Sequence, residues 1–222
     1  KIKGLSIISH VFKKAEEANI GEVIVAAEDQ EIVDDVKQNG GQAILTKNGH
    51  KTGTDRIYEV FQKINSAEID LVMNLQGDEP LINIDDIRNL NKKMIESSSK
   101  LGTLASKIQN KTLLENPNVV KVLTKKNLNQ TNFPEALNFM RNITEEKKNI
   151  YHHLGVYSYN KDTLEKFVSL NQSTSEIKNK LEQLRALDND IKINVAFAKF
   201  DPIGVDTEED LEAVKKIMEN KS

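Results

Sequence analysis

The chain has 222 residues, of which 31 are basic and 34 acidic, and its formal net charge is −3. This charge argues against a general nucleic-acid binder or a protein of anionic membrane surfaces, since such proteins present a strongly basic surface. We expect one large domain over residues 1–222 with its own hydrophobic core, because a chain of this length needs no disulfide or structural metal. Cysteine is absent altogether, which fits a cytoplasmic location in a reducing compartment.

Helices and strands alternate over the first hundred residues. Apolar spacing predicts helices over residues 5–19, around 32–36, over 55–64 and over 85–95, with short apolar strands at 23–27, 43–45 and 71–75. Short apolar strands that alternate with helices in this way are typical of βαβ units. The pattern therefore predicts an α/β fold whose mainly parallel, Rossmann-like sheet has helices on both faces.

The rhythm changes after the serine run at residues 97–99. Strand composition at residues 103–108, 119–123 and 154–159 predicts a smaller antiparallel lobe, an insertion or dimerisation element over about 103–159. Helices at 161–168 and 175–187, a strand at 191–197 and a last helix from about Thr207 then restore the α/β pattern.

Two acidic loops follow predicted strands, where ligands gather in open α/β sheets. In Gln76-Gly77-Asp78-Glu79-Pro80, the glycine allows a ligand close to the backbone and Asp78 is placed to bind a divalent cation. A turn or helix-capping aspartate is an equally weighted alternative. Asp206, in Gly204-Val205-Asp206, also has the position of a helix cap. Together the two aspartates suit Mg²⁺, which takes one or two carboxylates and fills its shell with water and phosphate oxygens.

A third loop, His50 to Arg56, combines glycine, hydroxyl groups and cations before a helix. Such a loop suits a phosphate group or a polar ring, although the Walker spacing is absent. His152 and His153 are neighbours in a predicted strand, so their side chains point to opposite faces and cannot readily share a metal. One of them is a candidate ligand-binding residue, while either alone is more often structural.

Six segments of the chain form a set in order along the sequence: residues 52–56, 75–80, 117–122, 153–157, 181–185 and 204–211. The set closely resembles the CMP-Kdo synthetases, the 3-deoxy-manno-octulosonate cytidylyltransferases, and the resemblance covers nearly the whole chain. It implies a nucleotidyltransferase fold and transfer of CMP from CTP to the anomeric hydroxyl of Kdo. Kdo is an acidic eight-carbon sugar of lipopolysaccharide, and the reaction releases pyrophosphate.

The resemblance also implies roles for individual residues. Asp78 and Asp206 would bind the Mg²⁺ cofactor as metal ligands and catalytic residues, and Thr52, Gly53 and Arg56 would lie at the nucleotide. The implied contacts to Kdo are Gln76, Arg141, His153 and Glu182. The family further suggests a homodimer that forms through the antiparallel lobe, with CTP and Kdo as the small-molecule substrates.

The sequence departs from the family in four places. The family opens with a strand and a basic loop for the triphosphate, which we expect to precede Lys1. Met140 stands where the family has Ser, before Arg141, and the family's Pro-Ile-Pro stretch is not recognisable before Tyr151. Position 179, acidic in the family, is Asn.

Two other functions compete with this interpretation. A CMP-sialic acid synthetase or another sugar nucleotidyltransferase would share the fold, but the segment Leu181–Arg185 and His153 favour Kdo. A scaffold protein without activity is disfavoured, because it would have no evident need for Asp78, Asp206 and Arg141 together.

Overall fold

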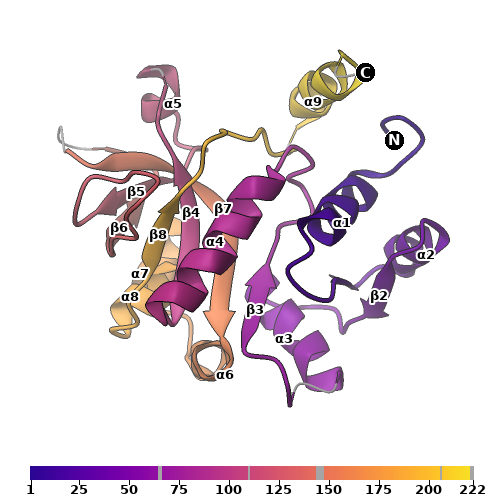
Figure 1. The fold of residues 1–222 in the computed structure, drawn as a ribbon, viewed down its shortest axis with the longest axis horizontal. Helices are drawn as coiled ribbons and strands as arrows, with labels where there is room; N and C mark the ends of the chain where they lie inside the picture. Colours follow the sequence, from indigo (N-terminus) through magenta and orange to yellow (C-terminus); the bar gives the residue numbers. More distant parts are fainter. Residues whose placement is uncertain (65–66, 110, 144–147, 206, 221–222) are drawn as a thin grey trace. The chain divides into compact units, whose positions relative to one another are not determined.

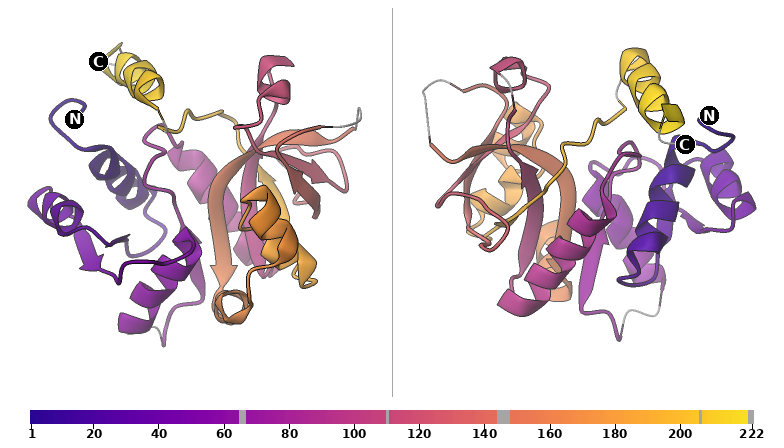
Figure 2. Two further views of the ribbon diagram at one scale, coloured as in Figure 1. Left: turned by 180° about the vertical axis from the view of Figure 1, so that it is seen from behind. Right: turned by 45° about the horizontal axis from the view of Figure 1, so that its top comes forward.

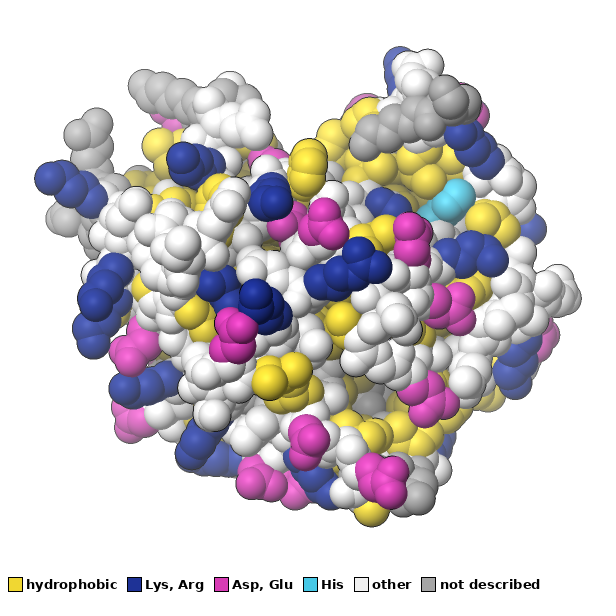
Figure 3. Space-filling model, viewed as in Figure 1, with side chains coloured by type: hydrophobic (Ala, Val, Ile, Leu, Met, Phe, Trp, Pro, Cys, Tyr) yellow, Lys and Arg dark blue, Asp and Glu magenta, His cyan; other side chains and the backbone are white. Residues whose placement is uncertain are grey.

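The computed structural model describes residues 1–64, 67–109, 111–143, 148–205 and 207–220 (Figure 1). The chain divides into two compact units. The first unit comprises Lys1–Ala67, Asn74–Arg88 and Pro202–Ser222, and the second comprises Glu68–Met73 and Asn89–Asp201. Acidic and basic side chains are interspersed on the face drawn in Figure 3. Among the described residues, no helix has both the length and the apolar character needed to cross a bilayer.

The first unit begins with alternating helices and strands, as the sequence predicts. Its elements are α1 (Ile7–Ala18), β1 (Ile24–Ala27), α2 (Gln30–Gln38), β2 (Gln42–Leu45), α3 (Gly53–Lys63), the start of α4 (Ile84–Ser97) and α9 (Glu208–Asn220). β1 and β2 pair in parallel, from Ile24 with Gln42 to Ala27 with Leu45. The connection between them is α2, so this stretch is the predicted βαβ unit.

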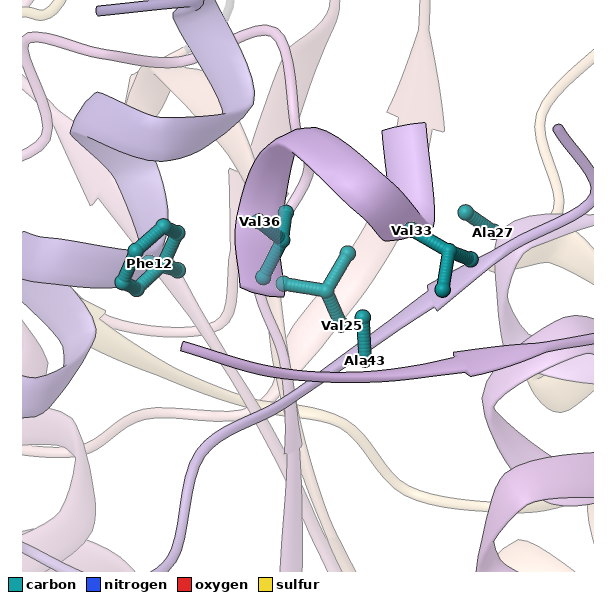
Figure 4. Packing of buried hydrophobic residues seen from close by; sticks show 6 residues of the cluster. All are labelled: Phe12, Val25, Ala27, Val33, Val36 and Ala43. Carbon is teal, nitrogen blue, oxygen red and sulfur yellow. The ribbon is translucent and has the colours of Figure 1, made fainter. Parts of the chain in front are cut away.

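Buried apolar side chains from four elements form a core in this unit (Figure 4). Val33 and Val36 lie three residues apart on one face of α2, which directs both toward the β1–β2 pair. Phe12 of α1 closes the cluster and is 2% exposed. The amphipathic spacing read from the sequence therefore identifies the core-facing side of α1 and α2.

The second unit is built on one sheet. Its strands and helices are β4 (Leu101–Ser106), α5 (Lys111–Glu115), β5 (Lys121–Thr124), β6 (Ala136–Met140), β7 (Ile150–Asn160), α6 (Lys161–Ser169), α7 (Thr174–Asn179), α8 (Leu184–Asp188) and β8 (Asn194–Phe197). The strand order is β6-β5-β7-β4-β8, and β3 (Leu71–Asn74) also pairs with β7. β4 and β8 are parallel, whereas β7 runs antiparallel to both β4 and β5, and β5 antiparallel to β6.

Helices lie on both faces of this sheet. The part of α4 from Asn89 onward lies in front of the sheet in Figure 1, and α7 and α8 lie on the other face, seen in the left view of Figure 2. A sheet with helices on both faces confirms the predicted α/β class.

Three details of the predicted elements are wrong. The single helix at 175–187 is two short helices, because Lys180 has a left-handed backbone (φ 52°) that ends α7 before α8 starts. The strand at 191–197 begins only at Asn194, and β6 was not predicted.

Candidate active site

The N-terminal end of α3 begins at the third candidate loop, in the first unit. Thr52 is the N-cap, and its hydroxyl accepts a hydrogen bond from the backbone N–H of Asp55 at 3.2 Å. The helix therefore starts at Gly53, and the backbone N–H groups of its first turn point out of its N-terminal end. A helix start of this kind favours negatively charged groups, since the N-terminal end of the helix dipole is positive.

Glu59 fastens the loop before α3 to the body of the helix. Its carboxylate accepts from the backbone N–H of Lys47 at 3.0 Å, lies 2.6 Å from His50 Nε2 and pairs with Lys63 Nζ at 2.6 Å. The hydrogen bonds from Lys63 and His50 lower the pKa of Glu59 to about 2. The loop that precedes Thr52 is thus fixed in place.

Arg56 is one turn into α3 and is already paired. Its Nη1 donates to Thr46 Oγ1 at 2.9 Å, and its Nη2 donates to Glu28 Oε2 at 2.7 Å. The hydrogen bond from Arg56, followed by its charge, lowers the pKa of Glu28. Arg56 therefore braces β1 against α3 in this structure, and Glu28 partly balances its positive charge.

The end of β3 lies against the start of α3. Asn74 Nδ2 donates to Thr54 Oγ1 at 3.3 Å within the buried part of the first unit. A Cβ placed on Gly53 would lie 3.4 Å from the amide of Gln76, so the Gln76 side chain packs on Gly53. The structure therefore brings together Thr52, Gly53 and Gln76, three of the residues predicted for the site.

The two acidic loops meet at a main-chain hydrogen bond in the first unit. The backbone N–H of Val205 donates to the carbonyl oxygen of Asp78 at 2.9 Å, and the Asp78 side chain is exposed. Gly77 lies beside it, and a Cβ there would lie 2.9 Å from Ile8 Cδ1, so a larger residue would require the Ile8 side chain to shift. Asp206 follows Val205 along the chain but lies outside the described residues.

His153 is buried in the second unit and is electrically neutral. Its side chain is 6% exposed, and burial, followed by the charge of His152, lowers its pKa to about 3. Nε2 lies 3.0 Å from Thr103 Oγ1, which donates its own proton to the carbonyl oxygen of Val156 at 2.6 Å. The proton of His153 is therefore on Nε2, which donates to Thr103, and Nδ1 has a lone pair that can accept a hydrogen bond.

His152 faces different partners, as the strand geometry predicts. Its Nδ1 lies 2.5 Å from Asp201 Oδ1, and Ser106 Oγ donates to the same oxygen at 2.8 Å. Ser106 and His152 both contact the carboxylate and not each other in these bonds, so the group does not have the arrangement of a Ser-His-Asp nucleophile.

Arg141 follows the end of β6 and donates to three main-chain carbonyl oxygens. Its Nε donates to Asn179 at 3.1 Å, its Nη1 to Pro117 at 3.3 Å and its Nη2 to Lys180 at 3.3 Å. A guanidinium has five N–H groups, so three such bonds leave a further N–H on each Nη. Arg141 therefore joins β6 to the C-terminal end of α7, and each of its two Nη atoms has one N–H beyond these bonds.

Lys121 is fully buried and contacts the main chain of Arg141. Its ammonium group donates to the carbonyl oxygens of Asn116 at 2.5 Å and of Arg141 at 2.7 Å. Burial, followed by the charge of Arg141, lowers the pKa of Lys121. Two neighbouring cations with carbonyl partners leave a positive potential in the second unit, where an anion is favoured.

Glu182 lies in the short turn between α7 and α8. Its side chain is partly buried, and its carbonyl oxygen accepts from the backbone N–H of Arg185 at 3.0 Å. Because Arg141 donates to the carbonyl of Lys180, two of the residues predicted for the sugar contact the same turn.

Sequence reasoning missed several residues of these two groups. Thr103 acts through His153, 50 residues away, and no local pattern marks it. Lys121 lies in the segment 117–122 and Glu59 is spaced i,i+4 from Lys63, but neither pattern reveals the buried ammonium group or the contact of Glu59 with the loop. Glu176 has a local signal, the Ser173-x-x-Glu176 spacing of a capping box, which the structure contains.

The comparisons with known proteins agree with one another. Residues 1–193 match the family model described as Cytidylyltransferase. The 3-deoxy-manno-octulosonate cytidylyltransferase of Bartonella tribocorum is 39% identical over 98% of this chain and 90% of its own length. The enzyme of the same name from Thermodesulfovibrio yellowstonii is 40% identical over 100% of this chain and 91% of its own.

Solved structures extend this agreement to the fold. A structure of CMP:2-keto-3-deoxy-manno-octonic acid synthetase complexed with CTP is 34% identical, with a TM-score of 0.88 over 100% of this chain and 91% of that one. UDP-glucose pyrophosphorylase complexed with UDP-glucose is only 12% identical, with a TM-score of 0.70 over 97% of this chain and 87% of that one, and shows the fold alone. The family predicted from the sequence is confirmed: the chain belongs to the cytidylyltransferases and, among them, to the 3-deoxy-manno-octulosonate cytidylyltransferases.

Proposed function

We propose that this enzyme transfers CMP from CTP to Kdo. The anomeric hydroxyl of Kdo attacks the α-phosphorus of CTP, a new P–O bond forms, and pyrophosphate leaves with the electron pair of the broken P–O bond. The product, CMP-Kdo, is an activated sugar for lipopolysaccharide biosynthesis. The observation that supports this reaction most strongly is the match over the whole chain to CMP:2-keto-3-deoxy-manno-octonic acid synthetase, whose structure was solved with CTP.

The first unit has the groups that suit the nucleotide. We assign Thr52, Gly53 and Arg56 to it, since the start of α3 and the loop held by Glu59 present backbone N–H groups in a fixed position. Because Arg56 pairs with Glu28, we propose that Arg56 holds the shape of this loop in addition to supplying positive charge.

We propose that Asp78 and Asp206 bind Mg²⁺. The hydrogen bond from Val205 to Asp78 supports this pairing, because it fastens the residue before Asp206 to the loop of Asp78. The donor set fits Mg²⁺, which needs only one or two carboxylates when phosphate oxygens and water complete its shell. Bound there, the ion would offset the negative charge of the triphosphate.

The second unit has the groups that suit an acidic sugar. The two remaining N–H groups of Arg141, one on each Nη, match the two oxygens of a carboxylate. His153 Nδ1 can accept from a sugar hydroxyl, and Glu182 is a further acceptor. We assign these three residues, with Gln76 of the first unit, to Kdo.

The substrate assignment is tested by pyrophosphate release from the full-length protein. We expect release with CTP and Kdo together, and background release when sialic acid replaces Kdo. Equal rates with the two sugars, or preference for sialic acid, would contradict the assignment to Kdo.

We further propose a homodimer that forms through β6. This strand lies at one end of the strand order of the second unit; its first residue, Ala136, donates to the carbonyl oxygen of Ile193, and its Leu137 side chain is 53% exposed. An exposed apolar side chain on the terminal strand of a sheet favours pairing of the rest of that strand with a second copy. A cytoplasmic location is also proposed, in keeping with the cysteine-free sequence and with the use of CTP as substrate.

A further inference from the structure

A buried ion pair joins α7 to α8 in the second unit. Arg185 Nε donates to Glu176 Oε2 at 2.9 Å and Nη2 donates to Oε1 at 2.6 Å, a two-pronged contact between side chains that are only 2% and 3% exposed. The same carboxylate accepts from the backbone N–H of Ser173 and from Gln172, each at 3.1 Å. Removing two charges from water costs about as much free energy as their attraction returns, so such a pair adds little net stability. A contribution to stability therefore does not explain why the pair is there.

The turn between α7 and α8 is closed by the two residues of the pair. Glu176 belongs to α7, and its carbonyl oxygen accepts from the backbone N–H of Leu181 at 3.2 Å. Arg185 belongs to α8, and its backbone N–H donates to the carbonyl of Glu182 at 3.0 Å. The pair thus fixes both ends of a four-residue turn that contains Glu182, in a segment with no proline to stiffen it.

Arg185 also reaches His153 through a row of aromatic rings. Its guanidinium lies over the Phe167 ring, 4.6 Å from the centroid. Successive ring centroids then lie 5.7 Å apart from Phe167 to Tyr159, 6.2 Å from Tyr159 to Tyr157, and 5.5 Å from Tyr157 to His153. Because these side chains are packed without space to shift independently, the guanidinium and the imidazole are linked in position.

We propose that the Glu176–Arg185 pair is a positioning unit for the sugar site, which sets the turn of Glu182 directly and the ring of His153 through the aromatic row. This inference rests on the proposed function, since it takes both residues as contacts of Kdo. Because the side chains of Glu176 and Arg185 are only 3% and 2% exposed, we assign neither of them as a contact of Kdo. A misplacement of about 1 Å at a substrate contact can reduce catalysis by about a hundredfold, so a small shift of this turn is sufficient to change the use of Kdo.

The test uses the double variant Glu176→Leu/Arg185→Met in the full-length enzyme. Replacing both partners of a buried ion pair by apolar residues commonly preserves stability, whereas removing one partner does not. We expect the double variant to fold with a melting temperature lowered only by the loss of the capping box to Ser173, a KM for Kdo raised about tenfold or more, and a KM for CTP within about twofold of the wild-type value. A folded double variant with an unchanged KM for Kdo would show that the pair is only structural.

Two further variants keep the result clear. Val195→Ala removes buried methyl groups from β8, outside the pair and the aromatic row, and we expect it to lower the melting temperature without changing either KM.

If the double variant does not fold, Glu176→Gln, which retains one acceptor for Arg185, is measured well below its melting temperature. The KM for Kdo alone should rise, and equal changes in both KM values would overturn the proposal. A wild-type enzyme that makes no CMP-Kdo would refute the proposed function instead, and is distinguished from these outcomes at once.

Discussion

Burial lowers the pKa of two individual side chains of the second unit, His153 and Lys121. His153 has hydrogen-bond capacity but no charge near neutral pH, and Lys121 has carbonyl partners in place of a carboxylate. A neutral imidazole can bind a sugar hydroxyl without attracting the phosphate groups of the nucleotide.

The pH dependence of stability tests the state of His153. Its pKa is 6.5 in the unfolded chain and about 3 in the folded one, so the unfolded state binds more protons between these values. The contribution of neutral His153 to the free energy of unfolding is therefore complete above about pH 6.5. It is lost as the pH falls toward 3, by at most about 1.4 kcal/mol per pH unit. Urea unfolding of His153→Gln, which keeps a donor for Thr103, should therefore show a flatter dependence between pH 5 and 6.5. A slope equal to that of the wild type would contradict the neutral, buried state.

Asp78 and Asp206 are the two proposed ligands of Mg²⁺. Asp78→Asn and Asp206→Asn remove a charged ligand, and each should lower kcat by about a hundredfold or more while the melting temperature stays nearly unchanged. If Asp78 only shapes a turn, the variant would instead lose about 1 kcal/mol of stability and retain turnover. Steady-state kinetics across Mg²⁺ concentrations, together with thermal melting, separate the two results.

Arg141 is predicted to bind the Kdo carboxylate through paired donors. Arg141→Lys keeps the charge but has no planar fork, so the KM for Kdo should rise much more than the KM for CTP. Equal increases would place Arg141 at the triphosphate. Because Arg141 also donates to Asn179 and Lys180, the melting temperature of the variant is measured alongside.

At the scale of secondary-structure elements, the start of α3 combines a helix cap with a candidate nucleotide site. Thr52→Ala removes the hydroxyl that accepts from Asp55 and should cost about 1 kcal/mol, whereas Thr52→Ser should retain most of it. Chemical denaturation gives these values. If the cap also orders the nucleotide loop, the KM for CTP rises in Thr52→Ala and not in Thr52→Ser. A normal KM for CTP in Thr52→Ala would limit Thr52 to its structural role.

The elements of the first unit are largely predictable from the sequence, because α1, α2 and the β1–β2 pair have periodic apolar residues and local turns. The break between α7 and α8 is not, since Ile177, Leu181 and Leu184 continue the helical spacing and Lys180 gives no local sign of a left-handed backbone. β6 has the sequence ALNFM, which lacks β-branched residues, and becomes a strand by pairing with β5.

The sequence predicts residue types for the candidate site but not the contacts of those residues. The assignments of Asp78, His153 and Arg141 rest on motifs, which are local in the chain. Their partners are not local: Thr103 is 50 residues from His153, and Lys180 is 39 residues from Arg141. Only the folded sheet brings such pairs together, so neither the protonated nitrogen of His153 nor the carbonyl partners of Arg141 follow from the sequence.

At the scale of the whole molecule, the proposed dimer can be tested at β6. Light scattering should give twice the mass of the chain, and Leu137→Glu should give the single-chain mass, because it places a charge on an exposed edge strand. Glu135, which pairs with Lys125 and Lys192 near the same strand, offers a control in Glu135→Gln, which should remain dimeric. A wild-type monomer at micromolar concentration would contradict the dimer.

The place of β4 in the sheet has a consequence for synthesis of the protein. β4 is buried along its whole length between β7 and β8, and its parallel partner β8 pairs residue 194 with residue 102. While the ribosome makes the intervening chain, one side of β4 has no neighbour, and slow, long-range pairing of this kind exposes nascent chains to aggregation. A polypeptide that stops before Asn194 would leave that edge of β4 unpaired. Completion of the sheet therefore depends on the synthesis of β8.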